Sequence, residues 1–203
     1  MKITRFSFPL TVFLLGGPVL AQQHEIGLTL GGVFGSSRRA PSGSLDLRRG
    51  VALQANYGYR IWGSGESPAA LYIEGHFLSS PLRDIKTANT GATRDFATLY
   101  VAPGLRVKFA PSSRVSPYVA AGGGYALYEQ STTTIGGGVN AAPRHIHRGA
   151  FHFGGGVDYR VLPWLAFRGE VRDFYTGSPA FGAPVAGGQH NVVASGGFVL
   201  RFR

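Results

Sequence analysis

The chain contains no cysteine, so neither disulfide bonds nor thiolate metal sites stabilise it. Acidic residues are also scarce, because 10 Asp and Glu stand against 20 Lys and Arg, which gives a formal net charge of +10 at pH 7. Beyond the N-terminal segment, no stretch approaches the roughly 20 apolar residues that a transmembrane helix needs. These absences argue against a disulfide-stabilised secreted domain and against a helical membrane protein.

Glycine, in contrast, is abundant, with 31 residues spread through the sequence rather than confined to turns. Glycine weakens a strand unless the backbone must bend or approach another backbone closely, as the wall of a barrel requires. A soluble core built from such strands would be poorly filled. The glycine content therefore favours a closed barrel.

The N-terminus has the features of a secretory signal peptide. Lys2 and Arg5 give a positive start, residues 6–20 are mostly apolar, and Val19 with Ala21 forms a small-residue cleavage pattern. A retained membrane anchor is the alternative, but the apolar segment is short for a span. We expect residues 1–21 to be removed and residues 22–203 to form one domain.

The stretch 165–172 shows the pattern that organises the rest of the chain. Its apolar residues alternate with Ala166, Arg168, Glu170 and Arg172. A period of two with one apolar face is typical of a half-buried strand. With charges on the other face, the pattern predicts a membrane strand whose apolar face contacts lipid while its charges pair in the lumen.

Eight segments alternate in this way, at residues 25–34, 51–62, 70–78, 96–109, 118–128, 150–160, 165–175 and 191–202. Long connections alternate with short ones; the long ones are 35–50, 79–95, 129–149 and 176–190, and the short ones are 63–69, 110–117 and 161–164. Long loops at one end and tight turns at the other are typical of outer-membrane barrels. The sequence thus predicts an all-β fold, an eight-stranded antiparallel up-and-down transmembrane β-barrel with periplasmic termini.

Aromatic residues fall near both ends of the predicted strands, as expected for the two interfaces of a membrane. At the turn side they are Tyr59, Trp62, Phe109, Tyr118, Tyr159, Trp164 and Phe202. At the loop side they are Phe34, Phe77, Tyr125, Phe151 and Tyr175.

The stretches 118–125 (YVAAGGGY), 154–159 (GGGVDY) and 168–172 (RGEVR) resemble strands of the small bacterial outer-membrane β-barrels related to OmpA and OmpX. This resemblance covers the chain after the leader and implies an eight-stranded barrel in a Gram-negative outer membrane. The ending 197–202 (GFVLRF) is similar to the family's C-terminal assembly signal, although Arg203 follows the aromatic Phe202. The resemblance implies insertion by the barrel-assembly machinery, and we expect a monomer.

A second prediction concerns a network of ions in the lumen. Its expected members lie on the polar faces of the strands, and they are Arg60, Glu74, Arg106, Asp158, Arg168, Glu170 and Arg172. If the turn 162–164 pairs Val161 with Leu165, Asp158 lies opposite Arg168. The network is either a gate for ions or water or a charged plug, and the narrow interior of an eight-stranded barrel favours the plug.

The long loops are basic. The residues that we expect to contact polyanions are Arg38, Arg39, Arg48, Arg49, Arg83, Lys86, Arg144 and Arg148. Together with Arg94 they outnumber the acidic residues of these loops, which are Asp46, Asp84 and Asp95. Such a rim attracts phosphate-rich lipopolysaccharide or other polyanions, although ordinary solvated loops would have a similar composition. No recognition helix or aromatic-basic platform indicates nucleic-acid binding.

Neither a metal site nor a catalytic site is predicted. His145 and His147 lack a nearby carboxylate or thiolate and are flanked by arginines, so a solvated basic loop is the better interpretation. His190 and Ser195 fall on opposite faces of one strand. The resulting hypothesis is a structural, surface-interacting barrel without cofactor. A narrow passive pore and a lipid A-modifying enzyme are the alternatives, and the charged inner faces argue against a soluble lipocalin.

Overall fold

The computed structural model describes residues 23–36, 38–40, 43–63, 66–177, 179, 181 and 187–203, with backbone only for 38–40 and 43–45. The predicted signal peptide lies outside these residues. No helix in the described part of the chain is long and apolar enough to cross a membrane.

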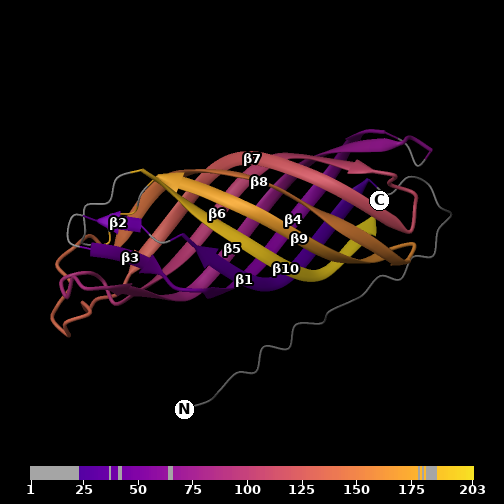
Figure 1. Cartoon of the computed structure of the whole chain (residues 1–203). Helices are drawn as coiled ribbons and strands as arrows, with labels where there is room; N and C mark the ends of the chain where they lie inside the picture. The colour runs from indigo at the N-terminus through magenta and orange to yellow at the C-terminus, as the bar shows by residue number, and fades with distance from the viewer. Residues whose placement is uncertain are drawn as a thin grey trace, which may run out of the picture.

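Eight long antiparallel strands among the described residues close into a ring, which confirms the predicted fold (Figure 1). They are β1 (His24–Gly35), β4 (Gly50–Trp62), β5 (Ala69–Thr87), β6 (Asp95–Phe109), β7 (Val115–Gln130), β8 (His145–Leu162), β9 (Leu165–Gly177) and β10 (Gly188–Phe202). Each strand pairs with its neighbours along the chain, and β1 pairs with β10 along its whole length, from His24 opposite Phe202 to Gly35 opposite Asn191.

Two short strands extend the wall at the loop end. β2 (Arg38–Ala40) and β3 (Gly43–Leu47) form a hairpin, and β3 pairs with the end of β5. Figure 1 places this hairpin at the end of the barrel opposite the C-terminus. The sequence predicted a plain connection here. The sequence also predicted that the third strand ends at residue 78 and that the sixth strand begins at residue 150. In the structure, β5 continues to Thr87 and β8 begins at His145. The wall therefore continues beyond the expected strand ends.

Strand β9 shows how alternation separates the two faces of the wall. Arg168, Glu170 and Arg172 point inward and are buried. Phe167 and Val171 point outward, where 48% and 53% of their surface is exposed. The polar face is enclosed and the apolar face is open, as lipid on the outside requires.

Most of the predicted aromatic residues at the strand ends point outward, but Tyr118 does not. It is buried in the lumen. The position of an aromatic residue near a strand end predicts its depth in the membrane. Whether its position is odd or even along the strand decides whether the side chain points into the lumen or toward lipid. Ser116, Tyr118 and Ala120 share the inward parity of β7, so the assignment of Tyr118 to the turn-side girdle was wrong.

The turn between β8 and β9 brings Asp158 directly opposite Arg168, as predicted. The predicted partner of Leu165 was Val161, but Leu165 pairs with Leu162. Val161 is the additional residue of a β-bulge between Arg160 and Leu162.

Candidate functional site: the filled lumen and the loop-end surface

The turn-side half of the lumen is organised around Asp158. Arg168 donates two hydrogen bonds to this carboxylate, from Nε to Oδ1 at 2.7 Å and from Nη2 to Oδ2 at 2.9 Å. The Lys108 ammonium lies 2.7 Å from Oδ2. Since all three side chains are buried, the bidentate pair is protected from the solvent screening that weakens surface ion pairs.

A second buried carboxylate, Glu25, lies beside this group. Its Oε1 accepts from Lys108 Nζ at 2.5 Å, and its Oε2 accepts from Arg106 Nη2 at 2.7 Å. The Arg201 guanidinium completes the cluster, with Nε 3.4 Å from Glu25 Oε1. The predicted network omitted Glu25. The signal was available, because Glu25 has the inward parity of Gly27 and Thr29 on the first strand.

The network continues toward the middle of the barrel through Glu74 and Glu170. Glu74 lies 3.2 Å from Arg106 Nε and 2.6 Å from Arg172 Nη2. Arg172 Nε donates to Glu170 Oε2 at 3.0 Å, and the Tyr118 hydroxyl donates to the same oxygen at 2.7 Å. Six of the seven predicted residues thus lie in one connected set of ion pairs.

Arg60 is the seventh, and it lies apart. Arg60 is only partly buried, and it is not joined to the ion pairs that connect the other six among the described residues. Its backbone N–H donates to the Gln23 carbonyl oxygen at 2.8 Å. Arg60 is directly opposite Tyr72 and next to the bulge at the end of β4, so it lies at the turn-side mouth.

The loop-side half of the lumen holds a cluster of aromatic rings that the sequence did not predict. We call it the aromatic plug, and its members are Phe96, Tyr100, Tyr128, Phe174 and Phe181, all buried. Tyr100 and Tyr128 share a hydroxyl–hydroxyl hydrogen bond of 3.0 Å, and the Tyr128 hydroxyl lies 2.6 Å from Thr176 Oγ1. Ring centroids of Phe96 and Phe181 are 4.5 Å apart.

Two buried histidines separate the aromatic plug from the ion network. The rings of His76 and His152 lie 5.7 Å apart, and both lie 5.5 Å from the Phe174 ring. His76 Nε2 bonds to Gln54 Oε1 at 2.9 Å, and Gln54 Nε2 donates to Glu170 Oε1 at 3.2 Å. Polar contacts therefore lead from the charged half of the lumen to the base of the plug.

Arg83 is inside the barrel, and its assignment to the polyanion-contacting loops was wrong. Only 1% of its surface is exposed. It donates from Nη1 to Asn191 Oδ1 at 2.8 Å and from Nε to the Arg48 carbonyl oxygen at 3.2 Å, and its guanidinium lies over the Phe96 ring. The cause is a bulge in β5 between Ser80 and Arg83. The additional residue reverses the alternation and turns Arg83 inward.

The other predicted rim residues lie at the loop end of the barrel. Arg48, Arg49 and Lys86 are exposed. The side chains of Arg38 and Arg39 lie outside the described residues.

Two acidic residues partly neutralise this rim. Arg94 pairs with Asp95 at 2.9 Å, and Arg144 pairs with Glu129 at 2.6 Å. Glu129, which lies beyond the loop-side aromatic ring, was missing from the predicted balance of charges. The hydrogen bond and the charge of Arg144 lower the pKa of Glu129.

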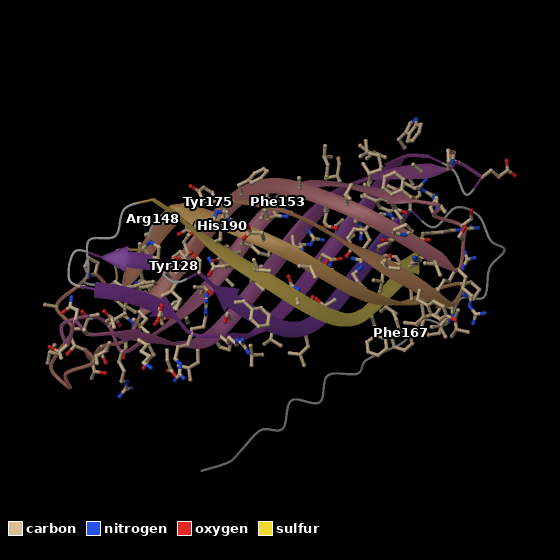
Figure 2. All side chains as sticks on the ribbon, in the orientation of Figure 1. Tyr128, Arg148, Phe153, Phe167, Tyr175 and His190 are labelled. Atoms are coloured by element: carbon tan, nitrogen blue, oxygen red, sulfur yellow. The ribbon has the colours of Figure 1, made fainter. Side chains whose placement is uncertain are left out.

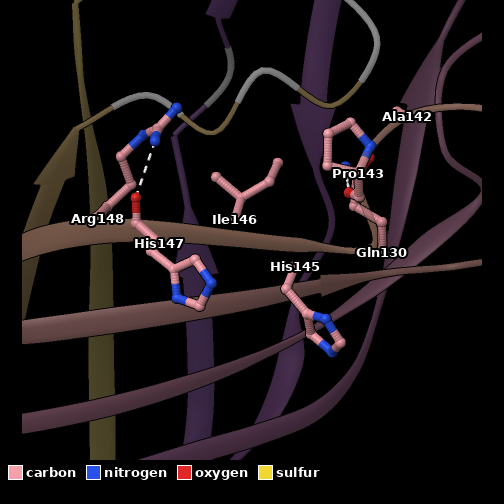
Figure 3. Close-up of a pocket in the computed structure, with 7 residues that line it drawn as sticks. All are labelled: Gln130, Ala142, Pro143, His145, Ile146, His147 and Arg148. Carbon is pink, nitrogen blue, oxygen red and sulfur yellow. Dashed lines mark hydrogen bonds between the residues drawn. The ribbon is translucent and has the colours of Figure 1, made fainter.

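The histidines of the third long connection belong to strand β8 rather than to a loop. Figure 3 shows His145 and His147 on one side of the strand and Ile146 on the other. His147 bonds to the Tyr125 hydroxyl, and Arg148 Nη1 donates to the His147 carbonyl oxygen at 2.8 Å. No group of three potential metal ligands gathers within the described part of the chain.

Comparison with known proteins agrees with this architecture. The family model described as the outer membrane protein beta-barrel domain matches residues 9–202. The chain belongs to this outer-membrane β-barrel family. No curated protein sequence matches it.

Solved structures of outer-membrane barrels share the fold. Neisserial surface protein A is similar with a TM-score of 0.56 and 16% identity, over 88% of this chain and 97% of that one. The outer membrane protein OprG from Pseudomonas aeruginosa is similar with a TM-score of 0.51 and 15% identity, over 90% and 97%. At these identities the likeness shows the fold alone.

In an outer-membrane barrel the outer wall faces lipid, and this makes one acidic residue unusual. Asp173 has the outward parity of β9, two positions after Val171 and two before Tyr175. Its Oδ2 lies 2.5 Å from Nδ1 of His190 on β10. Figure 2 shows His190 beside Tyr175 near the loop end, on the same wall as Phe153. The pair was not among the predicted sites, although an acidic residue in an apolar face was a visible signal.

Proposed function

We propose that this outer-membrane barrel has a structural and surface-interaction role, with a plugged lumen and a basic rim that contacts lipopolysaccharide or other polyanions. The observation that carries the proposal is the continuous filling of the lumen. From Glu25 to Phe181, buried ion pairs, histidines and aromatic rings follow one another along the barrel. An eight-stranded barrel has an interior just wide enough for side chains to fill.

The balance of charge at the loop end supports the second half of the proposal. With Arg83 moved inside and Glu129 added, the long connections contain the bases Arg38, Arg39, Arg48, Arg49, Lys86, Arg94, Arg144 and Arg148 against the acids Asp46, Asp84, Asp95 and Glu129. This excess of positive charge favours phosphate-rich partners.

Two measurements test this function. The purified barrel in planar bilayers should show no conductance steps, and it should bind inorganic polyphosphate with an affinity that falls as salt rises. Replacing Arg48 and Lys86 by Gln should weaken polyphosphate binding, whereas replacing the turn-side Arg114 should not. Regular conductance steps would support the passive-pore alternative, and salt-independent binding would contradict a basic contact surface. Lipid A whose mass changes on incubation with the barrel would support the enzyme alternative.

We further infer that the leader is removed, that the barrel-assembly machinery inserts the chain through β10, and that the barrel is a monomer. Phe202 supports the second point, since it points outward at the end of β10 and its ring lies 5.5 Å from His24 at the seam. The mature protein should begin at Gln22 by mass spectrometry, and the folded form should migrate differently on gels before and after boiling. Recovery of the protein in the soluble periplasm would contradict this route.

A further inference from the structure

The Asp173–His190 pair lies on the lipid-facing wall, where ionisable groups are costly. Ionisable residues that face lipid are rare and are by default candidates for function. The pair is also close: Nδ1 of His190 is 2.5 Å from Oδ2 of Asp173. The other oxygen, Oδ1, is buried and has no hydrogen-bond partner in the part of the chain that the structure describes.

This geometry orients the imidazole. When Nδ1–H donates to Asp173, Nε2 is left to face the surroundings, and in the protonated imidazole Nε2–H can donate to an anion. The side chain of His190 is 52% exposed, and the Tyr175 ring lies 4.8 Å from it. The imidazole therefore offers one ring nitrogen to a ligand, while Asp173 and Tyr175 hold the ring in place.

A cationic side chain lies on the same part of the wall. The Arg49 guanidinium lies 5.3 Å from the centre of the Phe34 ring. Phe34 is directly opposite Val192 on β10, and Val192 is directly opposite Asp173 on β9. Arg49 immediately precedes β4 and His190 lies on β10, so the two flank β1, the strand between β4 and β10 that carries Phe34.

Below Arg49 and His190 the wall is apolar. Phe34, Val192 and Phe153 all point outward and are exposed, and Phe153 is the cross-strand partner of Asp173. These residues belong to or lie just below the loop-side aromatic ring, which marks the level of lipid headgroups. Acyl chains can therefore lie against the apolar residues while a headgroup reaches His190 and Arg49.

We propose that the wall formed by β1, β8, β9 and β10 binds one phosphorylated lipid of the outer leaflet. The imidazolium form of His190 donates from Nε2 to the phosphate, the Arg49 guanidinium binds the same phosphate, Asp173 orients the imidazole, and Phe34, Val192 and Phe153 contact the acyl chains. We name this region the wall site. It rests on the proposed surface-interaction role and adds a lipid contact on the outer wall, to which Arg49 of the first long connection contributes.

The test titrates bisphosphorylated lipid A into the purified full-length barrel in a neutral detergent, with bound lipid counted by native mass spectrometry. His190→Gln and Arg49→Gln should each weaken retention about tenfold, the loss of one charge-assisted contact. His24→Gln is the matched control, because His24 also stacks on outward aromatic rings but lies at the turn end. Phosphatidylcholine, in which a quaternary ammonium group balances the single phosphate charge, should be retained weakly.

Asp173→Leu separates the wall site from general attraction by charge. Removing a carboxylate near a phosphate strengthens binding if charge alone acts, whereas the wall site predicts weaker binding because His190 loses its orientation. Unchanged retention by both His190→Gln and Arg49→Gln, tighter binding by Asp173→Leu, or equal retention of phosphatidylcholine would overturn the proposal. Gel mobility before and after boiling checks that each variant folds. If the other variants fail to fold, Arg49→Gln still tests the wall site, because it changes an exposed side chain.

The proposed rim function fails separately. Replacing Arg48 and Lys86 affects binding of soluble polyphosphate and should leave lipid A retention at the wall site unchanged. His190→Gln should do the opposite.

Discussion

In the turn-side half of the lumen, four carboxylates and five cationic side chains form connected ion pairs, whereas the loop-side half holds five aromatic rings joined by two tyrosine hydroxyls. Both halves fill the same narrow space. The charged half depends on every partner, because a buried ion without its counterion is costly. The aromatic plug depends mainly on volume and contact, so the loss of one polar atom affects it less.

Asp158→Asn should have the largest effect. The change removes the charge that compensates Lys108 and Arg168 in a buried position, and breaking such a pair costs about 3–5 kcal/mol. Urea unfolding in lipid vesicles measures the loss, with Asp46→Asn at the loop end as the control. Equal midpoints for the two variants would mean that water compensates the lumen charges.

Glu170→Gln should have the next largest effect, about 1.5–3 kcal/mol, the range for hydrogen bonds to a charged group. It should cost less than Asp158→Asn because the new amide oxygen still accepts from Tyr118. Stability alone should fall if Glu170 belongs to a plug. A change in single-channel conductance would instead indicate a gate.

Tyr128→Phe tests the aromatic plug and should cost only about 0.5–1.5 kcal/mol, the usual contribution of a neutral hydrogen bond. The ring stays, and the hydrogen bonds of its hydroxyl are lost, among them those to Tyr100 and Thr176. Tyr59→Phe on the outer wall is the matched control in the same unfolding assay. A loss of stability as large as that of Asp158→Asn would show that the aromatic plug depends on its polar atoms as strongly as the charged half does.

Glu129→Gln should have the smallest effect, with no measurable change in the unfolding midpoint at neutral pH. Glu129 and its partner Arg144 are both exposed. Exposed ion pairs contribute little to the free energy of unfolding. Because Arg144 lowers the pKa of Glu129, any contribution is present above the ordinary pKa of a glutamate and is lost as pH falls through the lowered value. A midpoint difference between the variant and the native chain that grows as pH falls would have the wrong sign.

Alternation was sufficient to predict the eight strands, their order and the pairing of Asp158 with Arg168, because each depends on a period of two and on a short turn. The same rule fails where the period is interrupted. The bulge before Arg83 reverses the inward and outward positions. The sequence around Pro81 has no pattern that predicts the additional residue. A shift of one residue moves a side chain to the other face.

The candidate sites were harder to predict for a second reason. The aromatic plug joins Phe96, Tyr128 and Phe181, which come from two strands and a loop far apart in sequence, so no local pattern connects them. The wall site likewise joins Arg49 and His190 across a seam between the first and last strands. Such sets depend on closure of the barrel, which a linear pattern predicts only in outline.

The connection between β7 and β8 shows what the extended wall means for recognition from outside the cell. Backbone hydrogen bonds join it to the connection between β5 and β6, from Arg94 to Thr133, from Ile135 to Ala92 and from Gly136 to Thr90. A turn at Gly137, with φ of 84°, ends this paired region. An antibody or phage that binds here would meet a backbone held by hydrogen bonds to the neighbouring connection rather than an isolated loop. A peptide epitope inserted after Gly137 would therefore be displayed at the tip of this hydrogen-bonded support.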